Sequence, residues 1–243
     1  MAAVLFTLAG CAGGSSQSSS GTSSGTSSGT SGGTSGGVTG GDFHSLVVDP
    51  STAGRIYVGG HSNVSRSDDG GKTWMAVTAL DGADAMGWTI EPAKIWVSGH
   101  PGLNLSIDGG TTFTRRNTGL ADTDVHAFGS AGQTLYAAGP GLGVAGSTDG
   151  GATWTTLTAA SGQSFFGRIL IDPADPQHLV AADVQFGANA SVDGGRTWTA
   201  ISAPAGATLV EASPAGTLYA GVHDGNAVTV WVSTDDGVTW KSP

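Results

Sequence analysis

The chain has 243 residues, of which 42 are Gly, only 12% are charged and a single one is Cys. One cysteine excludes an internal disulfide framework and any zinc module built from several cysteines. The 9 basic and 19 acidic residues give a net charge of −10, which argues against nucleic acid or an anionic lipid surface as a partner. Gly and Thr are common while Leu, Glu and Lys are scarce, so the composition predicts an all-β chain with many turns.

An apolar run over residues 2–10 stops at Cys11. The tetrapeptide Leu8-Ala9-Gly10-Cys11 resembles the lipobox of bacterial lipoproteins, and this resemblance implies cleavage before Cys11 and acylation of its amino group. The run is too short to span a bilayer as a helix. We therefore expect residues 1–11 to be a lipoprotein-type signal segment, with the membrane reached through a lipid anchor on Cys11.

Residues 12–41 form a segment of a different composition. Apart from Ala12, Gln17 and Val38, every residue in it is Ser, Gly or Thr. Such a composition cannot bury apolar surface and behaves as a flexible coil. The segment is predicted to be a linker that holds a folded domain, residues 42–243, away from the membrane.

The pattern Ser-x-Asp-x-Gly-x-Thr-aromatic occurs five times in residues 42–243, first from Ser67 to Trp74. Its central aspartates are 39 to 44 residues apart: Asp69, Asp108, Asp149, Asp193 and Asp235. The pattern is similar to the Asp-box, or BNR repeat. Five copies at this spacing favour a β-propeller of five four-stranded blades, each carrying one Asp-box.

The motif has a mechanical explanation. The short Asp carboxylate accepts backbone N–H bonds inside a tight hairpin, Gly permits a positive φ, and the aromatic packs back on the blade. The five aspartates are therefore predicted to be structural.

The repeats resemble those of bacterial Asp-box proteins described as glycosyl hydrolase-like or sialidase-like, and more remotely those of sortilin-type receptors and photosystem II assembly factors. For sialidases the resemblance implies an arginine triad, a Tyr nucleophile paired with Glu, and an Asp acid/base. The three tyrosines here occupy equivalent strand positions, which indicates a framework role: Tyr57, Tyr136 and Tyr219. The segment Phe166-Gly167-Arg168-Ile169 echoes the arginine motif without its Pro. No catalytic residue is assigned, and if the protein is an enzyme it is expected to be a glycoside hydrolase.

Most of the histidines fall at two equivalent positions of the repeats. Near the start of the innermost strand stand His44, Met86 and His126, with Gly167 at this position of the fourth repeat. Just past the end of the second strand stand His61, His100 and His223, with Asp183 in the fourth repeat. Because neighbouring strands are antiparallel, both positions face the same mouth of the propeller.

Imidazoles gathered at one mouth predict a transition-metal site. Imidazole with the Met86 thioether suits copper, and imidazole with Asp183 suits zinc or nickel. The alternative is that His tolerates half-exposed loop positions and that repeat duplication copied it. His178 falls outside both positions and is expected in a loop.

Two further residues are candidates for ligand binding. Trp88 lies two residues past Met86 on the same strand face, where it would wall a pocket or stack on a sugar. The alternative role for Trp88 is that of a wedge between blades. Asp183 would join the histidines at the mouth.

These observations predict a lipid-anchored, extracytoplasmic binding or scaffold module of the bacterial surface or periplasm. It would capture a transition metal, a small polar ligand, a glycan or a protein at a His-lined axial mouth. An exo-glycosidase of the sialidase superfamily and an assembly factor that docks on a membrane complex are the alternatives.

Overall fold

A computed structural model describes residues 38, 42–159, 164–213, 216–224 and 227–242 of the protein. The predicted signal segment, residues 1–11, lies outside the described residues, and so does Cys11 within it. The predicted linker also lies outside them, apart from Val38. The described chain is almost entirely β-strand, which confirms the all-β class. Its helical structure is a 3₁₀ turn, η1 (Thr78–Leu80), and no described helix has the length and apolar character needed to cross a membrane.

Consecutive strands pair antiparallel, and we name the sheets by repeat. Sheet 1 consists of β1 (Phe43–Val48), β2 (Ile56–Gly60), β3 (Val64–Ser67) and β4 (Met75–Ala76), and sheet 2 of β5 (Asp84–Glu91), β6 (Lys94–His100), β7 (Asn104–Ser106) and β8 (Thr114–Arg115). Sheet 3 consists of β9 (Ala127–Ala131), β10 (Thr134–Gly139), β11 (Gly143–Ser147) and β12 (Thr155–Thr158), and sheet 4 of β13 (Phe165–Ile171), β14 (Leu179–Asp183), β15 (Gly187–Ser191) and β16 (Thr199–Ala200). Sheet 5 consists of β17 (Ala207–Ala212), β18 (Leu218–Asp224) and β19 (Ala227–Ser233).

The last repeat differs from the four before it. Its described residues form a three-stranded sheet, and a single bridge joins Val232 to Lys241 where the other repeats have a fourth strand. The expectation of four strands in each repeat is therefore not met in sheet 5.

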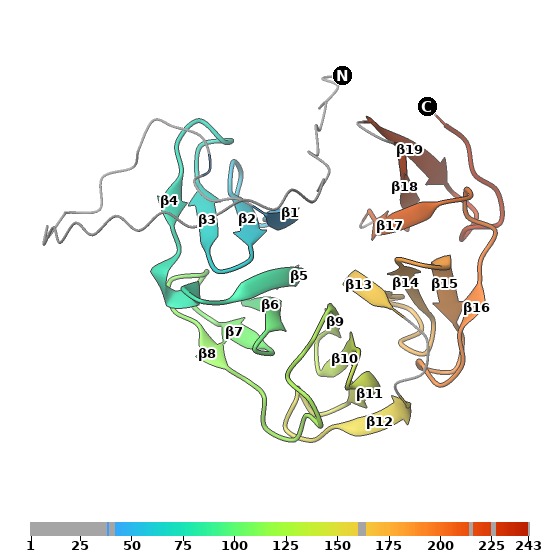
Figure 1. Cartoon of the computed structure of the whole chain (residues 1–243), viewed down its shortest axis with the longest axis horizontal. Helices are drawn as coiled ribbons and strands as arrows, with labels where there is room; N and C mark the ends of the chain where they lie inside the picture. Colours follow the sequence, from blue (N-terminus) through green and yellow to red (C-terminus); the bar gives the residue numbers. More distant parts are fainter. Residues whose placement is uncertain (1–37, 39–41, 160–163, 214–215, 225–226, 243) are drawn as a thin grey trace, which may run out of the picture.

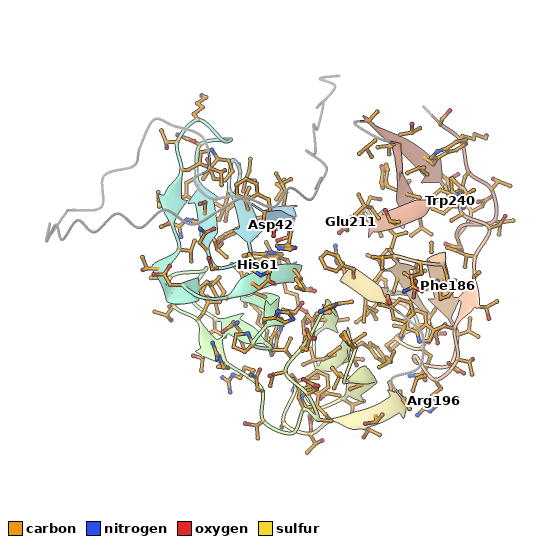
Figure 2. The ribbon with its side chains drawn as sticks, in the orientation of Figure 1. Asp42, His61, Phe186, Arg196, Glu211 and Trp240 are labelled. Atoms are coloured by element: carbon orange, nitrogen blue, oxygen red, sulfur yellow. The ribbon has the colours of Figure 1, made fainter. Side chains whose placement is uncertain are left out.

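The sheets stand side by side around a common centre (Figure 1). The first strand of each repeat lies innermost, and the later strands lie progressively farther out. In the same view the ring is open between β1 and sheet 5. Asp42 and His61 lie near the centre, while Arg196 and Trp240 lie toward the periphery (Figure 2).

Sheets 3 and 4 are joined more closely than the others. Their innermost strands, β9 and β13, pair in parallel through Gly167 with Ala127 and Arg168 with Phe128. The Gly167 N–H also donates to the His126 carbonyl at 2.9 Å. The two repeats therefore form one eight-stranded sheet.

Apolar side chains fill the junctions between successive sheets. Between sheets 1 and 2, Tyr57 and Trp88 stack with ring centroids 5.1 Å apart. Between sheets 2 and 3, Trp96 meets Phe128 at 5.4 Å. Buried apolar clusters also join sheet 3 to sheet 4 and sheet 4 to sheet 5. Burial of this surface is the main favourable contribution that fixes the sheets around the centre.

The repeated Ser-x-Asp-x-Gly-x-Thr turns are held by one set of hydrogen bonds. In the third copy, Asp149 Oδ1 accepts the Thr153 N–H at 2.9 Å and the Ser147 hydroxyl at 2.8 Å, and Asp149 Oδ2 accepts the Thr153 hydroxyl at 2.5 Å. The Gly151 N–H donates to Ser147 Oγ at 2.9 Å. The same bonds form around Asp69, Asp108, Asp193 and Asp235.

These bonds favour the ionised carboxylate and lower the pKa of each of the five aspartates from 3.8 to about 2. The largest cause in four turns is the hydroxyl of the Thr four residues on, and for Asp69 it is the Thr73 backbone N–H. A pKa depressed in the folded state contributes stability above the unfolded value, and this contribution is lost as the pH falls through the folded value.

We expect the free energy of unfolding to decrease as the pH is lowered from about 4 to about 2. Asp235→Asn removes one charged acceptor, so this variant should be less stable at neutral pH, with a difference from the natural protein that shrinks toward pH 2. Urea unfolding across this range measures both effects. Asp236→Asn, one residue away, is the control. A difference that is constant with pH would contradict the assignment.

Candidate metal centre

Four histidines meet at the inner end of sheets 1 to 3 because of the strand register. Phe43 of β1 pairs with Gly60 of β2, so His44 and His61 lie beside each other. His44 occupies an irregularity of β1 between Phe43 and Ser45, and such bulges re-aim the side chain of the extra residue. In sheet 2, Asp84 pairs directly with His100.

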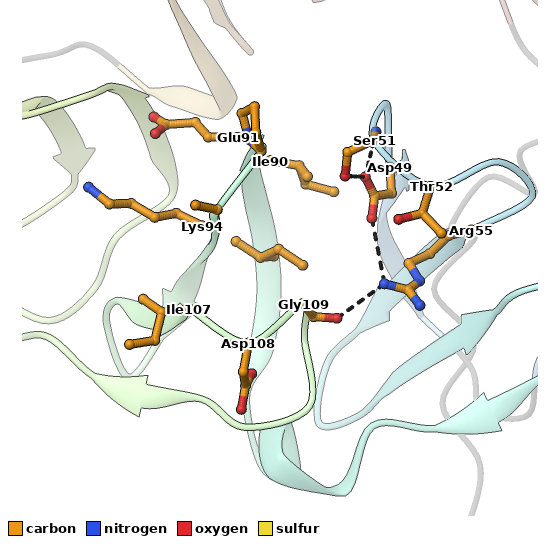
Figure 3. Close-up of a pocket in the computed structure, with 13 residues that line it drawn as sticks. Asp49, Ser51, Thr52, Arg55, Ile90, Glu91, Lys94, Ile107, Asp108 and Gly109 are labelled. Carbon is orange, nitrogen blue, oxygen red and sulfur yellow. Dashed lines mark hydrogen bonds and ion pairs between the residues drawn. The ribbon is translucent and has the colours of Figure 1, made fainter.

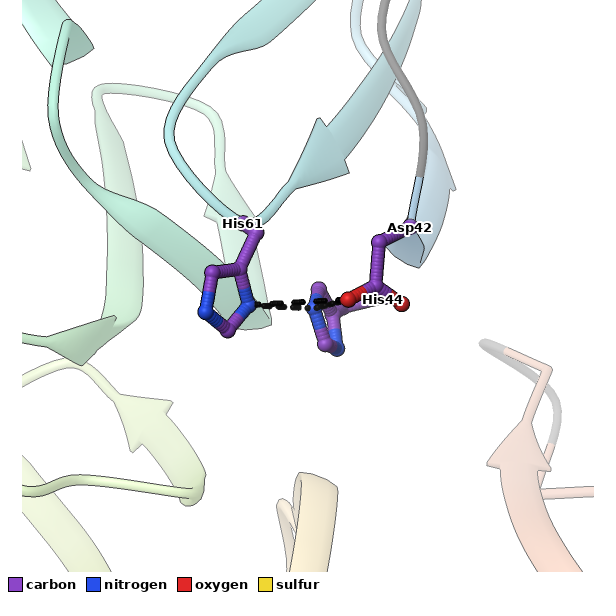
Figure 4. Close-up of side chains that lie close together, drawn as sticks. All are labelled: Asp42, His44 and His61. Atoms are coloured by element: carbon purple, nitrogen blue, oxygen red, sulfur yellow. Dashed lines mark hydrogen bonds and ion pairs between the residues drawn. The ribbon is translucent and has the colours of Figure 1, made fainter. Parts of the chain in front are cut away.

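The first group consists of Asp42, His44 and His61 (Figure 4). His44 Nε2 and His61 Nδ1 are 3.2 Å apart. The carboxylate oxygen Oδ2 of Asp42 lies 3.9 Å from the first nitrogen and 3.8 Å from the second. The His61 side chain is 65% exposed, so an ion has access to this group from solvent.

Asp84 closes the group from the neighbouring sheet. Its Oδ1 lies 3.5 Å from His44 Nε2 and its Oδ2 lies 3.3 Å from His61 Nδ1. The residue is only 3% exposed, and neither carboxylate oxygen has a hydrogen-bond partner. A buried carboxylate without a hydrogen bond is unfavourable unless a cation compensates its charge.

The second group consists of His100, Asp124 and His126. His126 Nε2 is 2.8 Å from Asp124 Oδ1, and His100 Nε2 contacts the same oxygen. The other ring nitrogen of His100, Nδ1, lies 3.6 Å from Asp84 Oδ2. Asp84 is therefore adjacent to both groups.

Phe166 lies between the two groups and was missed by the repeat alignment. Its ring centroid is 6.4 Å from that of His44 and 6.1 Å from that of His126. The alignment placed Gly167 at this position, but Phe165 takes the place of Phe43 in the register, so Phe166 follows it. The signal available in the sequence was the Phe-Phe pair before Gly167.

The same one-residue error affects Asp183, which was predicted to bind a ligand. Asp183 pairs with Phe165, as Gly60 pairs with Phe43, so it stands one residue before the position of His61. A shift by one residue points a strand side chain to the opposite face. The fully buried carboxylate accepts the backbone N–H groups of Ser164, Gln185 and Phe186, and these bonds give Asp183 a turn-capping role in place of the predicted one.

The Trp88 side chain is packed between the sheets. It is 5% exposed, stacks on Tyr57, and donates its indole N–H to Ser45 Oγ at 2.8 Å. These contacts place Trp88 in the seam between sheets 1 and 2, as the alternative interpretation expected.

The other two predicted metal ligands are Met86 and His223. Met86 lies at the irregularity of β5 and is buried, with 6% exposure. His223 lies on β18 opposite Val228, and its side chain is outside the described part of the chain. His178 lies apart from the mouth, with Nδ1 3.6 Å from Asp172.

A separate hollow of about 260 Å³ lies between sheets 1 and 2, at the opposite end of β1 and β5 (Figure 3). Its Arg55 donates to Asp68 at 2.7 Å and to the Gly109 carbonyl at 3.2 Å, and lies 3.8 Å from Asp49. The bond to Asp68 raises the pKa of Arg55. Because the guanidinium is already paired, this hollow is interpreted as a structural joint between the sheets.

No protein-family model matches the chain, and no curated protein matches it. Solved structures do match the chain in fold. An ancestral GH74 enzyme superposes with a TM-score of 0.55 at 19% identity, over 89% of this chain and 33% of that one. The GH74 xyloglucanase from Xanthomonas campestris gives a TM-score of 0.58 at 17% identity, over 84% and 38%. YCF48 bound to D1 peptide gives a TM-score of 0.52 at 15% identity, over 84% and 72%.

The chain thus spans about a third of the length of the GH74 structures it matches. Likeness at these identities shows the fold alone, and the fold is of the β-propeller type.

Proposed function

We propose that this protein is a surface-tethered, extracytoplasmic propeller of five Asp-box blades that binds a divalent transition-metal ion. The ligands in this proposal are Asp42, His44, His61 and Asp84. The tether is supported by the lipobox-like Leu8–Cys11 and the Ser/Gly/Thr-rich residues 12–41.

The observation that carries the proposal is the spacing of the donor atoms. An ion bound tetrahedrally at about 2.0–2.1 Å from its ligands keeps neighbouring donor atoms roughly 3.3–3.4 Å apart. The nitrogens of His44 and His61 are 3.2 Å apart, and the two oxygens of Asp84 lie one beside each nitrogen, Oδ1 3.5 Å from His44 Nε2 and Oδ2 3.3 Å from His61 Nδ1. Asp42 stands slightly farther away, at 3.9 and 3.8 Å.

The donor set favours zinc as the physiological ion. Two imidazoles and two carboxylates are ligands that zinc takes in tetrahedral sites, and the two carboxylates balance its two positive charges. Asp84 gains a partner for its buried carboxylate when the ion binds, which favours the bound state. Copper(II) would compete, since it binds most nitrogen and oxygen sites more tightly than zinc does.

The fold does not distinguish this proposal from its alternatives. It is shared with xyloglucanases and with YCF48, so a glycoside hydrolase and an assembly factor are both compatible with it. The His and Asp cluster favours metal binding, because its paired donor atoms have the spacing of a coordination sphere.

The test is zinc binding by the metal-stripped full-length protein, measured by isothermal titration calorimetry. The double variant His44→Ala, His61→Ala should lose affinity by on the order of 100-fold or more, because it removes two ligands where loss of a supporting residue alone costs about 10–100-fold. His178→Ala is the matched control and should bind as the natural protein does. Equal affinity in the double variant and the control would overturn the proposal.

A further inference from the structure

We infer that the mouth holds a pair of metal ions, the second bound by His100, Asp124 and His126, with the Asp84 carboxylate beside the first ion and next to the second ring nitrogen of His100. The inference rests on the proposed function, since it extends the first site to a second ion. It differs from that proposal in stoichiometry and in the residues that it requires.

Sheet 2 contributes to both groups through one pair of residues. Asp84 at the start of β5 and His100 at the end of β6 are direct register partners. Asp84 faces the histidines of sheet 1, whereas His100 turns its Nε2 to Asp124, which precedes sheet 3. The antiparallel register therefore holds a member of each group within one strand pair.

The second group has a donor set of two imidazoles and a carboxylate. One donor atom from each of its residues lies within 4.8 Å of the others. Without an ion, Asp124 Oδ1 forms a hydrogen bond with His100 Nε2 and lies 2.8 Å from His126 Nε2. An ion would replace the imidazole proton that lies between His100 Nε2 and Asp124. The half-exposed His100 side chain gives the ion access from solvent.

Asp84 lies beside the first group and contacts the second through the Nδ1 atom of His100. Its Oδ1 faces His44, and its Oδ2 faces both His61 and His100, at 3.3 and 3.6 Å. Both oxygens are buried and lack hydrogen bonds, so both are available to cations. A carboxylate next to the second ring nitrogen of a metal-binding His orients that ring, so Asp84 supports His100 as a ligand of the second ion.

Charge and surroundings agree with two ions. The three carboxylates of Asp42, Asp84 and Asp124 offset most of the charge of two divalent cations. The apolar Phe166 ring lies near both His44 and His126, and an apolar neighbour strengthens the attraction between ions and carboxylates.

The experiment counts zinc ions on the full-length protein by native mass spectrometry, with affinities from calorimetry. We expect two ions on the natural protein and on His178→Ala, and one ion on either His44→Ala or His126→Ala. Asp84→Asn keeps the size of the side chain and should weaken the binding of both ions by about 10-fold or more, because it removes a charge beside the first ion and the partner that orients His100 for the second. Far-UV circular dichroism verifies that each variant is folded.

The outcomes separate the inference from the proposed function. A single ion that is lost in His44→Ala and kept in His126→Ala would overturn the second site and leave the first standing. Two ions that persist in His126→Ala, or a second ion lost in His178→Ala, would overturn the assigned residues. No ion on the natural protein would overturn both proposals.

Discussion

Gly99→Ala is expected to destabilise the protein by about 3 kcal/mol or more, because an added methyl group would collide with backbone. A Cβ at Gly99 would lie 1.5 Å from the carbonyl oxygen of Asp84, and φ of Gly99 is +154°. The collision is with main chain, so rotation of a side chain cannot relieve it. Urea unfolding of the purified variant measures the loss.

Gly82→Ala is the matched control for this substitution. Gly82 also has a positive φ, +77°, but nothing lies within 4 Å of the position of its Cβ. The control therefore carries the conformational strain without the collision and should lose only about 1–2 kcal/mol. Equal losses in the two variants would show that close approach at Gly99 is not what requires glycine. We also expect Gly99→Ala to lose zinc binding together with stability, because the collision involves Asp84 and lies next to His100.

Trp88→Ala should destabilise the protein by about 3–5 kcal/mol, as large-to-small changes at buried aromatics do. Trp88 fills the seam between sheets 1 and 2, and its N–H bond ends on Ser45, whose hydroxyl in turn donates to the Ala85 carbonyl at 2.6 Å. Removal of the indole leaves a cavity against Tyr57 and breaks this chain. Thermal and urea unfolding both report the effect.

Trp88→Phe separates packing from hydrogen bonding. It keeps an aromatic ring in the seam and loses the indole N–H. We therefore expect the missing hydrogen bond to lower the free energy of unfolding by about 1 kcal/mol, in addition to the loss caused by the smaller ring. Zinc affinity should be unchanged in Trp88→Phe, because the indole lies outside both ligand groups. A large fall in zinc affinity with intact stability would instead assign Trp88 to the site.

The sequence carries most of the information about the strands, because the fold is a repeat. The spacing of Asp69 and its four counterparts predicts the period at which the sheets recur along the chain. The convergence of His44 with His61 followed from antiparallel neighbours alone.

Other features depend on details that a repeat does not encode. Asp84 was visible as a recurring acid at a strand start, but its burial without a partner arises only when sheets 1 and 2 pack together. The wide irregularity of β13, between Phe165 and Ile169, shifted the fourth repeat by one residue and hid Phe166. The contact of His100 with Asp124 and His126, which precede sheet 3, likewise depends on how the neighbouring sheets are placed.

The parallel pairing of β9 with β13 has a mechanical consequence. Sheets 3 and 4 share backbone hydrogen bonds at the centre and so behave as one stiff plate. Sheets 1 and 2 meet through side chains, and contacts between side chains can slide where a hydrogen-bonded ladder cannot. Any opening or closing of the ring will therefore occur at the seams outside that plate, including the one between sheets 1 and 2, and the spacing between the groups of His44 and His126 will change with it.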